Sequence, residues 1–318
     1  MQIRRMGKLF DPRDYASIEG SVGYAQSPQA LVLEDRLRIY FSTRVVDDSG
    51  KFVSHVAYVD LSKDLREVLG VSQHEVISQG ELGCFDEHGI FPFHVMAVDD
   101  LVYAYTNGWS RRASVSVETG IGLAVSRDSG ETFHRLGPGP IVTASLNEPF
   151  LVGDAFVRRY QSMFNMWYIF GKEWKCLPTD PTPERIYKIA HATSGDGINW
   201  NIGHGRQLIP DVLGPDESQA LPTVIKQSGT YHMFFCFRES FNFRAGEGRG
   251  YRLGYATSED LVSWQRRDEE LKFQEPFEEW DSEMQCYPHV FASDQRVFLL
   301  YNGNQFGRCG FGALELTL

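Results

Sequence analysis

Three segments of the chain repeat one pattern, in which alternating apolar residues lead into a polar turn that is followed by an aromatic residue. The segments are TGIGLAVSRDSGETFHRL (119–136), YKIAHATSGDGINWNIG (187–203) and YRLGYATSEDLVSWQRR (251–267). The alternation predicts strands, and the polar turns predict tight connections between them. A fainter copy covers residues 53–68, and residues 307–318 match the first half of a fifth. A repeat of this kind restricts the chain to folds built from similar units.

A second pattern, two apolar strands joined by a short polar hairpin, alternates with the first. Its five copies are anchored by Pro28, Pro92, Asp154, Pro222 and Pro288, which follow one another at intervals of 62–68 residues. Five units of about 64 residues therefore account for the whole chain.

Each unit holds about four strands, and helical periodicity is almost absent from the chain. We therefore predict an all-β fold, a single five-bladed β-propeller domain (residues 1–318) of four-stranded antiparallel blades. The last unit runs out after its third strand. We expect the N-terminal segment QIRRMGKLF (2–10) to supply the missing outer strand and so to close the last blade. A β-sandwich also has many short strands, but it would not explain units that recur about every 64 residues.

The composition excludes several partners. The chain has 31 Lys and Arg against 42 Asp and Glu, a net charge of -11, so we expect neither nucleic acid nor an anionic membrane to be its ligand. No apolar run reaches the roughly 18 residues of a membrane span, and the first residues lack the apolar part of a secretory signal. We expect a cytoplasmic protein. Its five cysteines show no CxxC spacing, which predicts free thiols.

Acidic residues recur in the loops before the first strand of four of the five units, and in a propeller these loops reach the mouth of the central channel. The acids are Asp86 and Glu87, Glu148 and Asp154, Asp216 and Glu217, and Asp281 and Glu283. The first unit has none. Carboxylates that converge on one channel would repel one another unless a ligand or a cation compensates them, and such clustering is a hint of function. The alternative is that they cap loops or pair with basic residues.

Further polar and aromatic residues end the second strand of each unit: Arg44, Trp109, Lys172, Trp174, Arg238 and Asn304. Carboxylates and guanidinium groups bind hydroxyl groups, and indole rings stack on the apolar faces of sugars. The set suits a polyhydroxylated ligand. The alternative for the tryptophans is that they cover blade edges.

At this point the chain resembles the five-bladed propellers of glycoside hydrolase families 43, 32 and 68, and more loosely the family 130 phosphorylases. The likeness covers essentially all of the chain through the blade count, the ATSEDLVSW and ATSGDGINW turns and the acids before the inner strands. It implies that Glu217 is the general acid, that Glu148 matches the orienting acid of the third blade, and that the partner of Glu217 is Glu148, Asp86 or Glu87. On the first blade Ser27 stands where the family has its base, so that Asp86 or Glu87 would replace it. The substrate-binding residues then expected are Ser27, Arg44, His88, Trp109, Asp154, Lys172, Trp174, Arg238, Glu283, Tyr287 and Asn304.

These observations predict a carbohydrate-active enzyme that cleaves or transfers a glycosidic bond of a small saccharide. A phosphorylase or a glycosyltransferase is an alternative. Phosphate brings its own nucleophile and needs only one acid and a basic cradle, for which Arg44, Lys172, Arg238 and His88 are candidates. A sugar-binding propeller without activity is a further alternative. We expect no cofactor and no metal-ligating residue, although the resemblance leaves room for a divalent cation such as calcium near His88 or His289.

Overall fold

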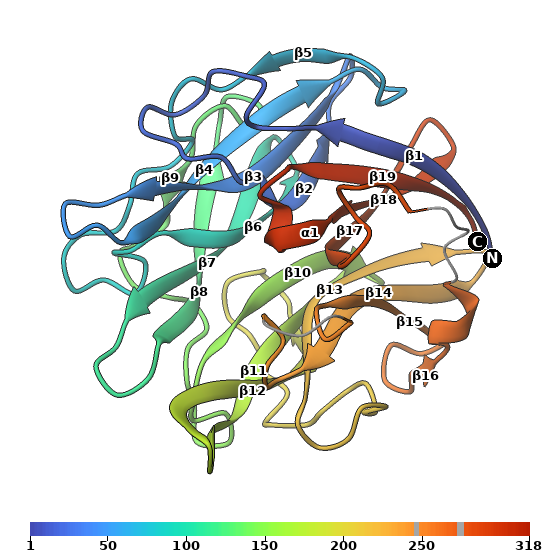
Figure 1. The fold of residues 1–318 in the computed structure, drawn as a ribbon. Helices are drawn as coiled ribbons and strands as arrows, with labels where there is room; N and C mark the ends of the chain where they lie inside the picture. The colour runs from blue at the N-terminus through green and yellow to red at the C-terminus, as the bar shows by residue number, and fades with distance from the viewer. Residues whose placement is uncertain (245–247, 272–276) are drawn as a thin grey trace.

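The computed structural model of the protein describes residues 1–244, 248–271 and 277–318. Five antiparallel sheets surround a common axis (Figure 1). Their innermost strands are β2 (Gln26–Val32), β6 (Ile90–Val98), β10 (Val152–Tyr160), β13 (Glu217–Gln227) and β17 (Cys286–Ser293). Each innermost strand contacts the next one along the chain, and β17 contacts β2, which closes the ring. The predicted five-bladed β-propeller is therefore confirmed.

The remaining strands follow the innermost ones outward in chain order. The second strands are β3 (Leu37–Val46), β7 (Leu101–Arg111), β11 (Met163–Leu177), β14 (Thr230–Glu239) and β18 (Arg296–Asn302). The third strands are β4 (Phe52–Leu61), β8 (Val117–Ser126), β12 (Asp180–Ser194), β15 (Arg252–Ser258) and β19 (Phe311–Thr317). The outermost strands are β5 (Val68–Val71), β9 (His134–Arg135), β16 (Gln265–Arg266) and β1 (Gln2–Phe10). In the third blade an isolated bridge between Thr193 and Asn201 stands where the fourth strand would pair.

The N-terminal strand closes the last blade, as the sequence predicts. β1 pairs antiparallel with β19, with Gln2 opposite Thr317 and Phe10 opposite Phe311. Both chain ends consequently lie side by side at the edge of the fifth blade (Figure 1). The first and last strands of the chain thus share one sheet, and the ring of blades is held closed by their hydrogen bonds.

The repeated polar turns have one shared geometry. In each, a serine hydroxyl accepts a backbone N–H, at 2.9 Å from Gly130 to Ser126, from Gly197 to Ser194 and from Leu261 to Ser258. An aspartate two residues after the serine accepts further amides, and those of Ser263 and Val262 lower the pKa of Asp260 to about 2. The turn residues fix the hairpin by satisfying its backbone donors.

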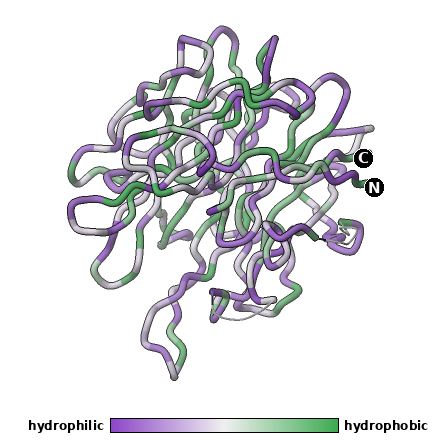
Figure 2. Tube along the Cα trace, turned by 45° about the horizontal axis from the view of Figure 1, so that its top comes forward, coloured by the Kyte–Doolittle hydropathy of each residue, from purple (hydrophilic) through white to green (hydrophobic). Residues whose placement is uncertain are grey.

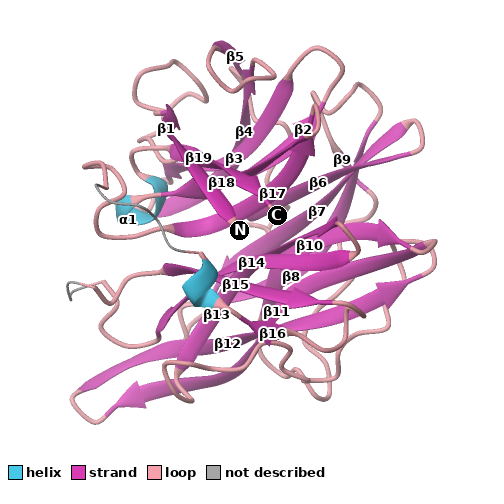
Figure 3. Ribbon diagram, turned by 90° about the vertical axis from the view of Figure 1, so that its right-hand side faces the viewer, coloured by secondary structure: helices cyan, strands magenta, loops and turns pink. Residues whose placement is uncertain are grey.

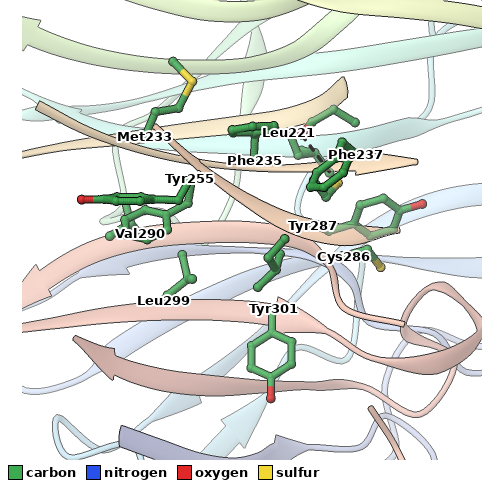
Figure 4. Close-up of a cluster of buried hydrophobic side chains, with 14 of the residues drawn as sticks. Leu221, Met233, Phe235, Phe237, Tyr255, Cys286, Tyr287, Val290, Leu299 and Tyr301 are labelled. Carbon is green, nitrogen blue, oxygen red and sulfur yellow. Dashed lines mark hydrogen bonds between the residues drawn. The ribbon is translucent and has the colours of Figure 1, made fainter. Parts of the chain in front are cut away.

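The core lies between neighbouring blades. Figure 4 shows how Met233, Phe235 and Phe237, which alternate along β14, lie across from Val290 of β17 and Leu299 of β18. Alternate residues of a strand share one face, so one strand can fill the space between two sheets. The peripheral loops are largely hydrophilic, whereas hydrophobic stretches follow the strands inside the molecule (Figure 2).

The short helical turns are η1 (Asp268–Glu270) and α1 (Asn304–Gly307). Within residues 1–244, 248–271 and 277–318, none of the helices has the length and apolar character needed to cross a membrane. The five cysteines are free thiols, two of them, Cys236 and Cys286, buried in the core.

Every innermost strand has a β-bulge near its beginning. In four blades the bulge contains a non-glycine residue with positive φ: 53° at Ser27, 54° at Asp154, 48° at Leu221 and 57° at Tyr287. Asp154 is therefore equivalent to Ser27, and Ala155 stands where the other blades have proline. The residue equivalent to the anchoring prolines is therefore Ala155 in the third blade, one residue after Asp154, which the sequence predicts as the anchor. A bulge turns a side chain away from its regular position, and bulges are common beside functional sites.

Candidate active site

A cavity of about 510 Å³ opens at the bulged end of the innermost strands. All five blades line it, and the innermost strands supply Gln26, Phe91, Asp154, Ala220 and Tyr287. Three of these, Phe91, Asp154 and Tyr287, stand at the bulge. The volume falls within the range of small-molecule sites and suits one or two sugar rings.

Asp154 is the one carboxylate among the described residues that line the cavity. Its side chain accepts a single hydrogen bond from a described residue, from the backbone N–H of Leu221 at 3.2 Å. Burial raises the pKa of Asp154 to about 7, although the amide of Leu221 and the charge of Arg185 act in the opposite direction. A carboxyl group with this pKa exists in both protonation states near neutral pH, which suits proton transfer.

Arg238 is a buried cation without an acidic partner in the cavity wall. It is 1% exposed, and its guanidinium lies 3.5 Å above the ring of Phe243. Its hydrogen bonds go to neutral acceptors, the hydroxyl of Tyr187 at 3.1 Å and the carbonyl of Glu239 at 2.9 Å. The Nε atom is buried and has no hydrogen-bond partner in the described part of the chain. A buried charge without a counter-charge is unfavourable, so this site favours an anionic ligand.

Three further arginines line the same cavity, which gives it a basic character in an acidic chain. Arg44 donates to Gln26 at 2.9 Å, and Arg185 donates to Ser116 at 3.1 Å. Neither forms an ion pair with a described carboxylate, whereas Arg244 pairs with Glu184 at 3.0 Å. Guanidinium groups bind phosphate and carboxylate oxygens in a bidentate manner, so the cavity combines one acid with a group of anion-binding side chains.

Aromatic side chains form much of the remaining wall. Trp109 donates to Ser54 at 3.3 Å and stacks against His88, with ring centroids 5.6 Å apart. The ring of Tyr287 lies 5.2 Å from that of Phe91. Such surfaces stack on the apolar faces of sugars and add shape to the site.

The four predicted catalytic carboxylates do not line the cavity. Glu217 is fully buried and pairs with Arg266 of the outermost strand of its own blade at 2.6 Å. It also accepts the amides of Val212 and Leu213, both at 2.9 Å. Burial alone would raise the pKa of Glu217, but hydrogen bonds from Gln219, Arg266 and Val212 lower it below its ordinary value.

The other three predicted acids also have structural partners. Asp86 pairs with Arg135 at 2.6 Å, again on the outermost strand of its own blade. Glu148 accepts the hydroxyl of Tyr168 at 2.8 Å and the amide of Gly205 at 2.8 Å. Glu87 accepts the amide of Gly83 at 2.7 Å and lies 3.3 Å from His88. All four predicted catalytic carboxylates therefore have partners in the protein outside the cavity wall.

Of the predicted substrate-binding residues, five line the cavity: Arg44, Trp109, Asp154, Arg238 and Tyr287. His88 lies behind Trp109, and Ser27 is buried with its amide bound to Asn302 at 2.7 Å. Asn304 accepts the amide of the exposed Glu283 at 2.9 Å. Lys172 is exposed on β11, and Trp174 of the same strand packs at the edge of the core. The structure does not place these six residues in the wall of the cavity.

The sequence interpretation missed residues of the third strands that lie beside the final part of the second strands. Ser54, Thr119, Arg185 and Tyr187 all line the cavity. A third strand runs antiparallel to the second, so its first residues lie beside the last residues of the second, as Ser54 does beside Arg44 and Thr119 beside Trp109. Strand pairing in the hairpins could have pointed to them.

The described residues contain no group of three or more His, Cys, Asp or Glu side chains that could hold a metal ion. For the calcium site that the resemblance allows, the environment of His289 is unsuitable: the positive charge of Arg158 acts on this ring and helps to lower its pKa. Calcium requires six to eight oxygen ligands, with carboxylates prominent among them.

The chain can be compared with known proteins by its fold and by its sequence. No family model matches it. Its fold is similar to that of a structure described as a glycoside hydrolase (TM-score 0.74, 15% identity, 99% of this chain and 93% of the other). It is also similar to a thermostable family-43 glycoside hydrolase (TM-score 0.65, 14% identity, 92% and 90%) and to the β-1,2-mannobiose phosphorylase of Listeria innocua (TM-score 0.68, 12% identity, 100% and 97%). These likenesses confirm the resemblance in fold to the glycosidase propellers.

Two proteins of Mycobacterium tuberculosis are similar along the full sequence. They are described as uncharacterized proteins MT1551 (strain CDC 1551 / Oshkosh) and Rv1502 (strain ATCC 25618 / H37Rv). Each is 30% identical over 318 residues, which is 99% of this chain and 99% of the relative. The chain therefore belongs to the family of MT1551 and Rv1502.

Proposed function

We propose that the protein breaks and forms a glycosidic bond with inorganic phosphate as the nucleophile. The observation that carries this proposal is the makeup of the cavity, in which the described lining has one carboxylate, Asp154, and several arginines without acidic partners. Similar folds in a family-43 glycoside hydrolase and in a mannobiose phosphorylase support a saccharide as the substrate.

Phosphorolysis fits the cavity better than hydrolysis does. Glycoside hydrolysis by the usual routes needs two carboxylates, one to protonate the leaving oxygen and one to activate water or to attack the sugar. The described cavity wall supplies only the first. Phosphate carries its own nucleophilic oxygen, and arginines can hold it and lower its charge repulsion.

In the proposed reaction Asp154 is the general acid. The bond between the anomeric carbon and the leaving oxygen breaks while a phosphate oxygen bonds to that carbon. Asp154 gives its proton to the leaving oxygen, and the acidic proton of the dihydrogen phosphate returns to the carboxylate. The products are a sugar 1-phosphate and a free hydroxyl on the leaving sugar. The pKa of about 7 keeps Asp154 partly protonated at neutral pH, as this step requires.

Arg238 and Arg185 are the residues that we assign to phosphate. Arg238 donates to Tyr187, two residues after Arg185 on the same face of β12, so the two arginines approach one part of the cavity. The charge of Arg185 also acts on Asp154, which links this part of the cavity to the acid. Trp109 and Tyr287 supply the aromatic surfaces for the sugar rings.

The test is a screen of disaccharides for sugar release with and without inorganic phosphate, and of sugar 1-phosphates for phosphate release with sugar acceptors. We expect release in both directions, with strict dependence on phosphate. D154N should lower the rate by about 10²–10⁴-fold, the usual contribution of a general acid. D216N removes a carboxylate that pairs with Lys175 at the surface, and it should leave the rate unchanged.

Two results would overturn the proposal. Sugar release without phosphate would show hydrolysis, and saccharide binding without any product would show a sugar-binding module.

A further inference from the structure

Below the cavity the innermost strands bring three nitrogen-bearing side chains together inside the ring. His94 follows Phe91 on β6, His289 follows Tyr287 on β17, and Arg158 lies four residues beyond Asp154 on β10. The rings of His94 and His289 are 5.9 Å apart although they belong to the second and the fifth blade. Blades that are not neighbours meet only near the axis, so this cluster lies in the central channel.

The channel cluster carries a positive charge without a carboxylate partner. Arg158 lies 4.3 Å above the ring of Phe156, donates to the carbonyl of Val157 at 3.1 Å and lies 3.3 Å from Nε2 of His94. It forms no ion pair with a carboxylate of the described residues. Burial lowers the pKa of Arg158 to about 10, a value that still keeps the group charged at neutral pH. A charge held in this way favours a counter-ion.

His289 is a buried polar group without a protein partner. The residue is 0% exposed, and neither Nδ1 nor Nε2 has a hydrogen-bond partner in the described part of the chain. His94, by contrast, faces the side-chain oxygen of Gln29 at 3.0 Å and the carbonyl of Val157 at 3.1 Å. Burial and the charge of Arg158 lower the pKa of His289, so its ring is neutral and offers one N–H donor.

These groups suit an anion and not a metal cation. A guanidinium and an imidazole N–H both donate, and the described contacts of the cluster include no carboxylate that could bind calcium. Arg158 is partly buried, and His94 and His289 are both 0% exposed, so the cluster lies below the surface of the molecule.

We propose that a small monovalent anion of the chloride type binds on the propeller axis between Arg158 and His289. The anion accepts hydrogen bonds from both side chains and balances the charge of Arg158. Since β10 and β17 belong to different blades, the bound ion links them and stabilises the closed ring. This site is separate from the cavity and does not depend on the proposed reaction.

The first test is crystallographic. Crystals of the full-length protein are soaked in sodium bromide, whose anomalous signal locates the ion. We expect a bromide peak between Arg158 and His289. Absence of the peak, or a peak at this position from soaked calcium or manganese, would overturn the proposal.

The second test measures the melting temperature while chloride replaces methanesulfonate at constant ionic strength. A bound ion stabilises the folded state, and we expect a rise of about 2–4 °C at high chloride. R158Q and H289F should abolish this rise and the bromide peak. R159Q is the matched control, because Arg159 is the exposed neighbour on the same strand, and it should retain both. A melting temperature independent of chloride in the wild type, or a bromide peak unchanged in R158Q, would contradict the site.

Discussion

Two regions of the molecule differ in how their buried carboxylates are compensated. One region is formed by the loops and strand starts at the inner end of the blades, and the other is the cavity that the innermost strands line. Asp86 and Asp281 in these loops and Glu217 at the start of β13 are buried, and they pair with Arg135, Arg5 and Arg266 of the outermost strand of the same blade. In the cavity, Asp154 has one amide partner and a raised pKa. A buried carboxylate that the fold fully compensates holds the structure together, whereas one that it leaves under-compensated is available for chemistry.

The loop carboxylates form one repeated device, which we call the blade clamp and define as Asp86–Arg135, Glu217–Arg266 and Asp281–Arg5. Each clamp ties the loop at the inner end of a blade to the outermost strand of that blade. In the third blade, where the outermost strand is reduced to a bridge, Glu148 binds Tyr168 and the amide of Gly205. The recurrence of acids in the sequence is therefore a consequence of the blade architecture.

The largest effect on stability is expected from breaking a blade clamp. E217Q removes the buried carboxylate that pairs with Arg266, whose side chain is 4% exposed, and leaves Asp268 at 2.7 Å as the remaining acidic partner of that guanidinium. The free energy of unfolding should fall by about 3–5 kcal/mol, measured by urea denaturation. E283Q is the control: Glu283 is exposed on the corresponding loop, and its loss should change stability by no more than about 0.5 kcal/mol. Equal losses in both variants would contradict the clamp.

The raised pKa of Asp154 gives a second prediction, on the pH dependence of stability. The pKa of this carboxyl is near 7 in the folded protein and near 3.8 in the unfolded chain. The free energy of unfolding of the protein therefore falls as the pH rises between these two values. D154N should match the wild type near pH 4 and exceed it above pH 7 by about 2–4 kcal/mol, measured by urea denaturation across this range. A difference that does not change with pH would show that Asp154 has an ordinary pKa.

A third prediction concerns the cavity and the role of Arg238 in binding phosphate. R238Q removes the buried cation that we assign to phosphate and should raise the KM for phosphate about 10–100-fold, as expected for a charge-assisted hydrogen bond. Steady-state kinetics over a range of phosphate concentrations provides the measurement. R66Q, which alters an exposed arginine, should leave the KM unchanged. A normal KM in R238Q would assign the phosphate to another part of the cavity.

The smallest expected change in stability comes from the repeated polar turns. Like the blade clamps, these turns contribute to the stability of the fold and not to the reaction. S194A removes the hydroxyl that accepts the amides of Gly197 and Asp196 and should lower the free energy of unfolding by about 1 kcal/mol. Activity at saturating substrate should not change. A loss of activity without a loss of stability would connect these turns to the site.

The fold could be predicted in detail because its signals are local and repeated. Alternating residues, turns such as SRDSGETF and the N-terminal segment 2–10 each determine a strand or a turn, and five copies reinforce one another. The site was predicted only in part. Arg44, Trp109, Asp154, Arg238 and Tyr287 could be selected because they occur at equivalent ends of strands, and they line the cavity, but their roles in substrate binding stay a prediction.

The acids of the leading loops were assigned to the wrong environment for a physical reason. Whether a carboxylate faces a cavity or a blade depends on the donors that the fold brings near it, and Arg266 is 49 residues from Glu217 in the sequence. Spacing along the chain does not show such pairs. Asp154, in turn, was treated as a binding residue, because neither its bulge nor its burial is visible in the sequence.

The most direct test compares D154N with E217Q in one experiment, in which the phosphate-dependent rate is divided by the folded fraction measured in the same sample. We predict that D154N is fully folded and loses about 10²–10⁴-fold in rate, and that E217Q is less stable but has the wild-type rate per folded molecule. A folded E217Q without activity beside an active D154N would show that the loop carboxylate, and not the cavity carboxylate, performs the chemistry.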